Sequence, residues 1–399
     1  MPATEAATTG ETVMTALFNL GFRPFFLGAG VFASLSMAAW LAIYTTWYQP
    51  AMQGISASQW HAHEMIYGYT MAVIAGFLLT AIRNWTGIQT LQRAPLALVF
   101  ACWAVARLAL LAGTGFIALA AAADLLFMAL LIPACAAPIV RARQWRQMAV
   151  LSKLVLLGMG NALFYAGAFG LLDEGVRWSL YGAFYVVIAL ILTMGRRLIP
   201  LFTASGVEPK VTLRNSIWLD MSSLVLLVLF WIAEVFLQRH GIAAAASALM
   251  FLVNATRLGF WYTPGIWSRP LLWSLHAAFA LITAGFLLHA LTAVTALNPS
   301  LALHALAVGG IALVTLSMMA RVSLGHTGRS VHAPPRIVLV PLALLLLAAA
   351  LRVVAPLLAP SAYTTWILLS QACWIGAFAV FSVAWFPVLS RPRVDGATG

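Results

Sequence analysis

Long apolar segments recur along the whole chain, and each is close to the length that a lipid bilayer requires. A membrane-spanning helix needs roughly 20 mostly apolar residues. The segments lie near residues 26–48, 62–82, 95–114, 117–140, 150–172, 178–198, 216–238, 242–260, 270–293, 301–322, 337–358 and 362–388. Because lipid cannot satisfy a backbone amide, such segments cross a membrane as helices. The sequence therefore predicts an all-α, polytopic membrane protein with about 12 transmembrane helices.

Composition agrees with a membrane protein and argues against a soluble domain or a nucleic-acid-binding protein. Of the 399 residues, 63% are hydrophobic and only 8% are charged, whereas soluble domains are about 25% charged. The net charge of +12 is spread between the apolar segments, which does not indicate binding to nucleic acid. The connections are too short to fold alone, so we expect one transmembrane helical domain over 1–399, with polar tails at 1–15 and 390–399. No secretory signal peptide is evident at the start of the sequence.

Basic residues alternate between the connections in the way that the positive-inside rule describes. With the N-terminus inside, 18 of the 22 Lys and Arg residues fall on the cytoplasmic side. Arg177, Arg239 and Arg352 fall outside, and Arg107 lies within a segment. One helix more or fewer would destroy this alternation. We therefore expect both termini to be cytoplasmic.

The histidines of three predicted helices fall at two depths. The outer layer contains Glu64 and four histidines, His61, His63, His289 and His304. The inner layer contains His276 and His326, with Arg83, Arg196, Arg197 and Arg321 available beside them. His276 and His289 are 13 residues apart on one helix, which separates them by roughly 20 Å. The two layers therefore predict two separate sites.

Neutral imidazole is the commonest metal ligand and a usual axial ligand of haem iron. The outer histidines could hold a haem iron and a second metal, either copper or non-haem iron, and the inner arginines could pair with haem propionates. His61 and His63 would point about 200° apart on a helix and so address different centres. The alternative is that each histidine forms a hydrogen bond between helices. Asp124 and Glu234 likewise either relay protons or form local hydrogen bonds.

Four segments together resemble the NnrS family. They are FNLGFRPFFLGAG (Phe18–Gly30), WHAHEMIYGYTMAVIAGFLLTAIRNWTG (Trp60–Gly87), MGRRLIPLFT (Met194–Thr203) and MMARVSLGHTGR (Met318–Arg329). The resemblance implies a twelve-helix protein of the bacterial inner membrane that carries haem and copper. It also implies a role in nitric oxide metabolism during denitrification and in resistance to nitrosative stress. The resemblance does not identify the metal ligands. Their assignment to the outer histidines (His61, His63, His289 and His304) and the inner histidines (His276 and His326) rests on depth and spacing alone.

The resemblance and the two layers predict a protein that binds nitric oxide and reduces two molecules of it to nitrous oxide. The expected catalytic residues are His61, His63 and Glu64, at the outer site. The protein would carry one or two haems b, the second of them in the inner layer, where it would pass electrons to the outer site. Electrons would come from a quinol or a small cytochrome. Scavenging or sensing of nitric oxide without reduction stays open. So do a secondary transporter and a haem or copper delivery protein without its own redox activity.

Overall fold

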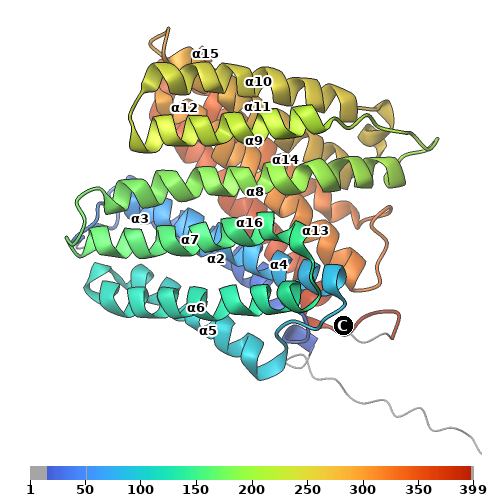
Figure 1. Ribbon diagram of the computed structural model, residues 1–399. Coiled ribbons are helices and arrows are strands. Elements are labelled where there is room, and N and C mark those ends of the chain that lie inside the picture. The colour runs from blue at the N-terminus through green and yellow to red at the C-terminus, as the bar shows by residue number, and fades with distance from the viewer. Residues whose placement is uncertain (1–15, 51, 397–399) are drawn as a thin grey trace, which may run out of the picture.

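The computed structural model describes residues 16–50 and 52–396 of the chain. The expected N-terminal tail at 1–15 and the last residues of the expected C-terminal tail lie outside the described residues. Within the described ranges, every regular element is a helix, and 12 helices are long and apolar enough to cross a membrane. Figure 1 shows them as a bundle of roughly parallel rods. The prediction of an all-α, polytopic membrane protein is confirmed.

Several of the spans are built from two or more consecutive helical elements. The first six spans are α2 (Phe22–Tyr44); α3 (Ala57–His63) with η1 (Glu64–Thr70) and α4 (Met71–Thr86); α5 (Arg93–Ala112); η2 (Thr114–Phe116) with α6 (Ile117–Arg141); η3 (Trp145–Gln147) with α7 (Met148–Ala168); and α8 (Gly175–Gly206). The last six are α9 (Ile217–Trp231) with η4 (Ile232–Phe236); α10 (His240–Trp261); α11 (Pro270–Thr292), which follows η5 (Pro264–Ser268); α12 (Pro299–His304) with η6 (Ala305–Ala312) and α13 (Leu313–His326); η7 (Arg336–Val338) with α14 (Leu339–Ala349), η8 (Ala350–Val354) and α15 (Ala355–Leu358); and η9 (Pro360–Ala362) with α16 (Tyr363–Ser390).

Local sequence explains where individual spans begin and end. Ser56 and Gln59 form a capping box at the start of α3, because each side chain accepts a hydrogen bond from the other residue's backbone N–H. The second span therefore begins before His61 and His63, and both histidines lie on the helix. Gly113 separates the third and fourth spans with a φ of 121°, a conformation that glycine adopts without steric cost.

The three most buried spans form the middle of the bundle. They are the second span, α8, and the span made of α12, η6 and α13. Around them, α2 packs against α4 and α16, α7 packs against α8, and α10 packs against α9 and α11 (Figure 1). Because these neighbours cover the central spans, polar side chains there can interact with one another rather than with lipid.

Both described ends of the chain lie on one face of the bundle. Arg23, at the start of α2, donates from Nη1 to the carbonyl oxygens of Leu389 (2.9 Å) and Arg391 (2.7 Å), at the end of α16. We call this side the terminal face and the opposite side the distal face. Twelve spans in the described residues require both ends to lie on the same side of the bundle. That the terminal face is cytoplasmic stays a prediction from the distribution of basic residues.

Four π-helical segments interrupt the spans in the described part of the chain: η1, η4, η6 and η8. A π-helical turn changes the direction in which side chains leave the helix, and such turns are frequent at functional sites. Glu64 lies in η1, Glu234 in η4 and Arg352 in η8, and His304 immediately precedes η6. The irregular turns therefore coincide with ionisable residues at membrane depth.

The orientation of the bundle can be tested with reporter fusions. A fluorescent protein fused to the C-terminus should fluoresce, and alkaline phosphatase fused after Thr295, between α11 and α12, should be active. The same phosphatase fused after His332, between α13 and η7, should be inactive, because that connection lies on the terminal face, which carries most of the basic residues. Active phosphatase after His332 together with inactive phosphatase after Thr295 would reverse the predicted orientation.

Candidate functional site

A cavity of 580 Å³ lies within the bundle and opens toward the distal face. Its lining comes from all three central spans and from α2, η8 and α16. Most lining side chains are aliphatic or aromatic, and the exposed Ser58 and the 45% exposed Tyr181 mark the opening. Cavities that hold cofactors commonly measure about 300–1,000 Å³ and combine an apolar wall with a few polar groups. This cavity fits that description.

His61 lines this cavity from α3. Its ring stacks on Trp40 of α2, with the ring centroids 4.6 Å apart and an interplanar angle of 13°. The Nδ1 atom is buried and has no hydrogen-bond partner in the described part of the chain. Leaving a buried polar atom unpaired is costly, and most such atoms in proteins are satisfied. His61 is thus fixed in orientation and retains unused capacity for a ligand.

His304 lines the same cavity from the end of α12. Its Nδ1 atom donates a hydrogen bond to the carbonyl oxygen of Ser300 at 2.7 Å, because a carbonyl can only accept. The lone pair of the neutral ring is then on Nε2. Histidines that bind metals usually have their second ring nitrogen fixed by such a bond to a carbonyl or carboxylate. His304 has this arrangement.

Arg352 is the third polar group of the cavity that bears on a ligand. It is 8% exposed and lies in η8, with Nη2 2.8 Å from Ser300 Oγ and 3.5 Å from His304 Nε2. No Asp or Glu is present among the described residues that line the cavity. A buried cation without a counter-charge is unfavourable, and a guanidinium pairs best with a carboxylate or phosphate. An anionic group within the cavity would satisfy it.

Arg352 is a site residue that was not predicted from the sequence. The signal was nevertheless present, because Arg352 interrupts an apolar segment and is one of three basic residues on the predicted outer side. An arginine at membrane depth is costly and therefore usually functional.

His63 lies outside this cavity, in a fully buried ion network with residues of α5, α6 and α7. Arg107 donates to Glu64 Oε1 at 2.6 Å through Nη1 and to Asp124 Oδ2 through Nη2. Tyr165 also donates to Asp124 Oδ2, at 2.7 Å. His63 Nδ1 lies 2.8 Å from Glu64 Oε1, and its Nε2 lies 3.2 Å from Asn161 Oδ1. Both ring nitrogens of His63 are therefore occupied by protein oxygens.

The ion network, rather than the cavity, contains three residues that the sequence singled out: His63, Glu64 and Asp124. His61 faces the cavity and His63 faces the network, as their spacing on one helix predicts. Glu64 is held by Arg107 and His63 rather than directed into the cavity. Asp124 forms local interactions, which was one of the two alternatives that the sequence left open. The assignment of His63 as a metal ligand stays a prediction that this geometry does not favour.

His289 lies apart from both groups, near the distal end of α11. Its Nε2 is 3.6 Å from Glu234 Oε1, and its Nδ1 is 3.2 Å from Ser247 Oγ. His240 approaches the other carboxylate oxygen of Glu234 at 3.4 Å. The four histidines of the predicted outer layer therefore divide among three places, and only His61 and His304 share one. Within residues 16–50 and 52–396, no three His, Cys, Asp or Glu side chains converge in a way that could hold a metal ion.

The inner histidines are not brought together either. His276 is buried, and its ring nitrogens lie 3.0 Å from the Leu272 carbonyl oxygen and 3.2 Å from the Trp261 carbonyl oxygen. His326 Nε2 lies 3.4 Å from the side-chain amide of Asn84. Each of these contacts matches the alternative of a hydrogen bond between or within helices.

Three of the four inner-layer arginines predicted to serve haem propionates, Arg196, Arg197 and Arg321, also lie apart from the cavity. Arg196 donates to Asp220 at 3.0 Å, and Arg197 donates to the side-chain oxygen of Gln147 at 3.0 Å. The guanidinium carbon of Arg321 lies 4.0 Å from the centre of the Phe202 ring, at the terminal face. None of the three lines the 580 Å³ cavity in the described structure.

Comparison with known protein families matches the chain to the NnrS protein family over residues 16–393. This range covers nearly the whole chain. The chain belongs to the NnrS family. Membership suggests a membrane protein related to nitric oxide that carries haem or another metal, and the 12 apolar helices agree with a multi-pass membrane protein. A comparison with curated proteins gave no match.

The ion network of this NnrS family member should be essential for stability. In Arg107→Met, the carboxylates of Glu64 and Asp124 lose their shared cation in a buried place, and removing one partner of such a pair costs about 3–5 kcal/mol. We expect a large fall in the yield of monodisperse protein and in its melting temperature, measured by fluorescence-detected chromatography after heating.

A matched variant separates charge from shape. Arg107→Met combined with Glu64→Gln and Asp124→Asn removes all three charges together, and it should recover most of the lost melting temperature. Arg143→Met, an exposed position in the connection just after α6, should melt like the unchanged protein. If the single and triple variants melt at the same temperature, the charge balance of the network does not explain its contribution to stability.

Proposed function

We propose that this protein binds a haem b in the 580 Å³ cavity, with His61 and His304 as candidate iron ligands, and that it binds nitric oxide there. The observation that carries the proposal is the meeting of these two histidines, from two different central spans, on one largely apolar cavity. Family membership supports the choice of haem and of nitric oxide.

The residues present fit a haem in three respects. His61 has an unpaired buried nitrogen, and His304 has its Nδ1 fixed so that Nε2 carries the lone pair, which faces Arg352 Nη2 at 3.5 Å. Arg352 is a buried cation that lacks an acidic partner among the described lining residues, and a haem propionate is a carboxylate that a guanidinium binds well. The aliphatic and aromatic wall would exclude water from the rest of the ring.

Haem iron in such a place supplies a binding site for nitric oxide and a route for single electrons. The protein contributes orientation and access. Trp40 holds the plane of the His61 ring, and the Ser300 carbonyl holds that of His304. Nitric oxide is small and soluble in lipid, so it can reach a largely apolar cavity without a polar channel.

We propose that this site reduces nitric oxide. The protein would act in the inner membrane of a bacterium and protect the cell against nitrosative stress. Two molecules of nitric oxide take up two electrons and two protons and yield one nitrous oxide and one water. A quinol or a small cytochrome would donate the electrons. The opening toward the distal face, marked by Ser58 and Tyr181, gives protons and products a path to that side.

We propose no residues for copper and no second haem. Within the part of the chain that the structure describes, no group of three potential ligands is available for a further metal. Both ring nitrogens of His276 already face backbone carbonyls.

Absorption spectroscopy on purified protein tests the proposal. Oxidised, dithionite-reduced, and reduced protein exposed to nitric oxide should show a b-type spectrum that changes with the gas. His61→Ala and His304→Ala should each lower haem retention by at least about tenfold, since even indirect partners of a metal contribute 10- to 100-fold. His289→Ala, a histidine from the same predicted layer, is the matched control and should retain its haem.

A second set of variants tests the role of Arg352. Arg352→Gln should weaken haem retention by about tenfold, because a charge-assisted hydrogen bond is lost, and Arg352→Lys should lose less. Arg239→Gln, another basic residue of the predicted outer side, should have no effect. A folded but colourless unchanged protein would rule out the haem and favour the transporter. A haem that ignores nitric oxide would favour electron transfer or delivery.

A further inference from the structure

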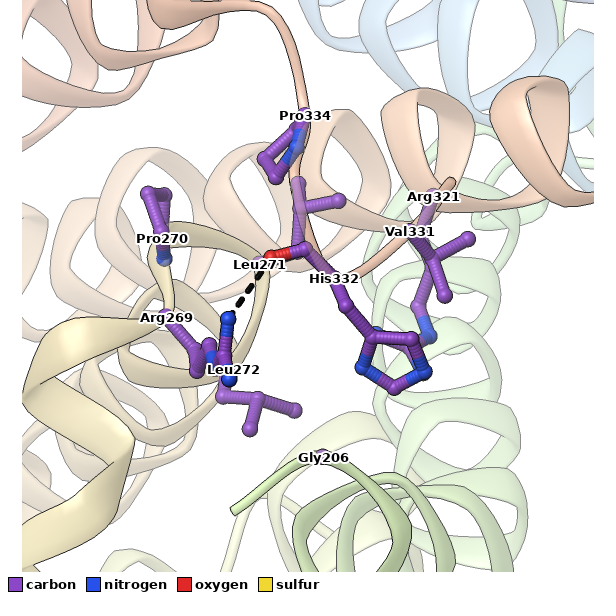
Figure 2. A pocket seen from close by; sticks show the side chains of 9 residues that line it. All are labelled: Gly206, Arg269, Pro270, Leu271, Leu272, Arg321, Val331, His332 and Pro334. Carbon is purple, nitrogen blue, oxygen red and sulfur yellow. Dashed lines mark hydrogen bonds between the residues drawn. The ribbon is translucent and has the colours of Figure 1, made fainter. Parts of the chain in front are cut away.

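A second, much smaller pocket lies at the terminal face, far along the bundle from the histidine cavity. Figure 2 shows the side chains that surround it, which come from the end of α8, the start of α11, the second half of α13 and the connection after α13. Its volume is about 10 Å³, which is room for roughly one water-sized group. Three of its lining side chains, Arg269, Arg321 and His332, carry or can carry positive charge, and none of the described lining residues is acidic.

Arg321 is the central feature of this pocket. The residue is 8% exposed, and its guanidinium stacks on Phe202 at 4.0 Å from the ring centre. No hydrogen-bond acceptor or carboxylate contacts it in residues 16–50 and 52–396. Stacking on an aromatic ring stabilises the cation, but it does not satisfy the five N–H donors of the guanidinium. A mostly buried guanidinium without an acidic partner is stabilised by an anion.

Two further groups at the pocket lack partners. Arg269 donates from Nη1 to the His332 carbonyl oxygen at 2.9 Å, the dashed line in Figure 2, while its Nε atom is buried without a partner in the described structure. The helix α11 begins here at Pro270, and no side chain caps it. Pro270 has no N–H, and the N–H groups of Leu272 and Trp273 donate to the Arg269 carbonyl oxygen, so this helix end contributes mainly its partial positive charge, which favours an anion. Two arginines and the positive end of α11 therefore converge on one small space.

We propose that this pocket binds an oxoanion of the phosphate type at the terminal face. One oxygen enters the pocket and accepts hydrogen bonds from Arg321 and Arg269, and the rest of the anion stays at the mouth beside His332. A planar guanidinium suits a phosphate group because it can donate two parallel bonds. The phosphate could belong to a lipid headgroup or to a free ion on that side. This site is distinct from the haem cavity, and it assigns Arg321 a role other than the propionate contact expected from the sequence.

Melting temperatures of the full chain test the proposal in two settings. In the first, detergent-solubilised protein is titrated with sodium phosphate at constant ionic strength. In the second, the protein is placed in nanodiscs of phosphatidylcholine alone or with added phosphatidylglycerol. The variants are Arg321→Gln and, as a control from the same face and outside the pocket, the exposed Arg336→Gln. We expect the apparent dissociation constant for phosphate to rise at least about tenfold in Arg321→Gln and to stay unchanged in Arg336→Gln.

Each outcome has a definite meaning. Stabilisation by sodium phosphate that needs Arg321 supports a free anion as the ligand. Stabilisation by phosphatidylglycerol alone that needs Arg321 supports a lipid headgroup. Equal shifts for all proteins in both settings would overturn the site. If Arg321→Gln does not fold, Arg321→Lys and Arg269→Gln, which keep more of the pocket, should still weaken the response. Haem content should be unchanged in these variants. Loss of haem would instead support the contact between Arg321 and a haem propionate that was expected from the sequence.

Discussion

The packing of the central spans depends on how the bundle neutralises buried charged groups, because the surrounding lipid supplies no counter-charge. Arg107 joins the second, third and fourth spans, because it contacts Glu64 and Asp124 at the same time. These three groups carry a net charge of −1, and His63 lies between the two carboxylates, 2.8 Å from Glu64 and 3.9 Å from Asp124. The network thus fixes the second span in rotation, and this rotation directs His61 toward the cavity.

The π-helical turns add to this control of direction. In a regular helix, residues 61 and 65 would share a face, and the pattern would continue unchanged along the span. The turn at η1 begins at Glu64, just where the span must present one residue to the ion network and others to the cavity. A similar turn follows His304, and another contains Arg352. Three of the irregular turns therefore surround one cavity, which supports its reading as a functional site.

The sequence was sufficient to predict the spans because their signal is local: each apolar segment reports its own length and composition. The break between the segments predicted at 95–114 and 117–140 was predictable for the same reason, since the glycine at position 113, with φ 121°, ends the helix by itself. Depth along the membrane was also predictable, but depth alone does not decide which side chains meet. His61, His63, His289 and His304 lie at similar depth and yet divide among three places, because rotation and packing of the helices decide their neighbours. Arg352 was missed because its partners come from a distant segment, 48 residues from His304.

The arginines of the bundle divide into those that the protein neutralises and those that it does not. Arg107 meets two carboxylates, and Arg196 and Arg257 meet Asp220. Arg352 and Arg321 are equally buried, at 8% exposure each, and neither contacts an acidic residue in the described structure. Burying an unpaired guanidinium is unfavourable for both residues. Because the protein supplies neither of them with an acidic partner, we infer that each is neutralised by a bound ligand. One such arginine faces a cavity large enough for a cofactor, and the other faces a pocket that admits a single oxygen. The size of the space beside each arginine, rather than its charge, therefore distinguishes the two ligands.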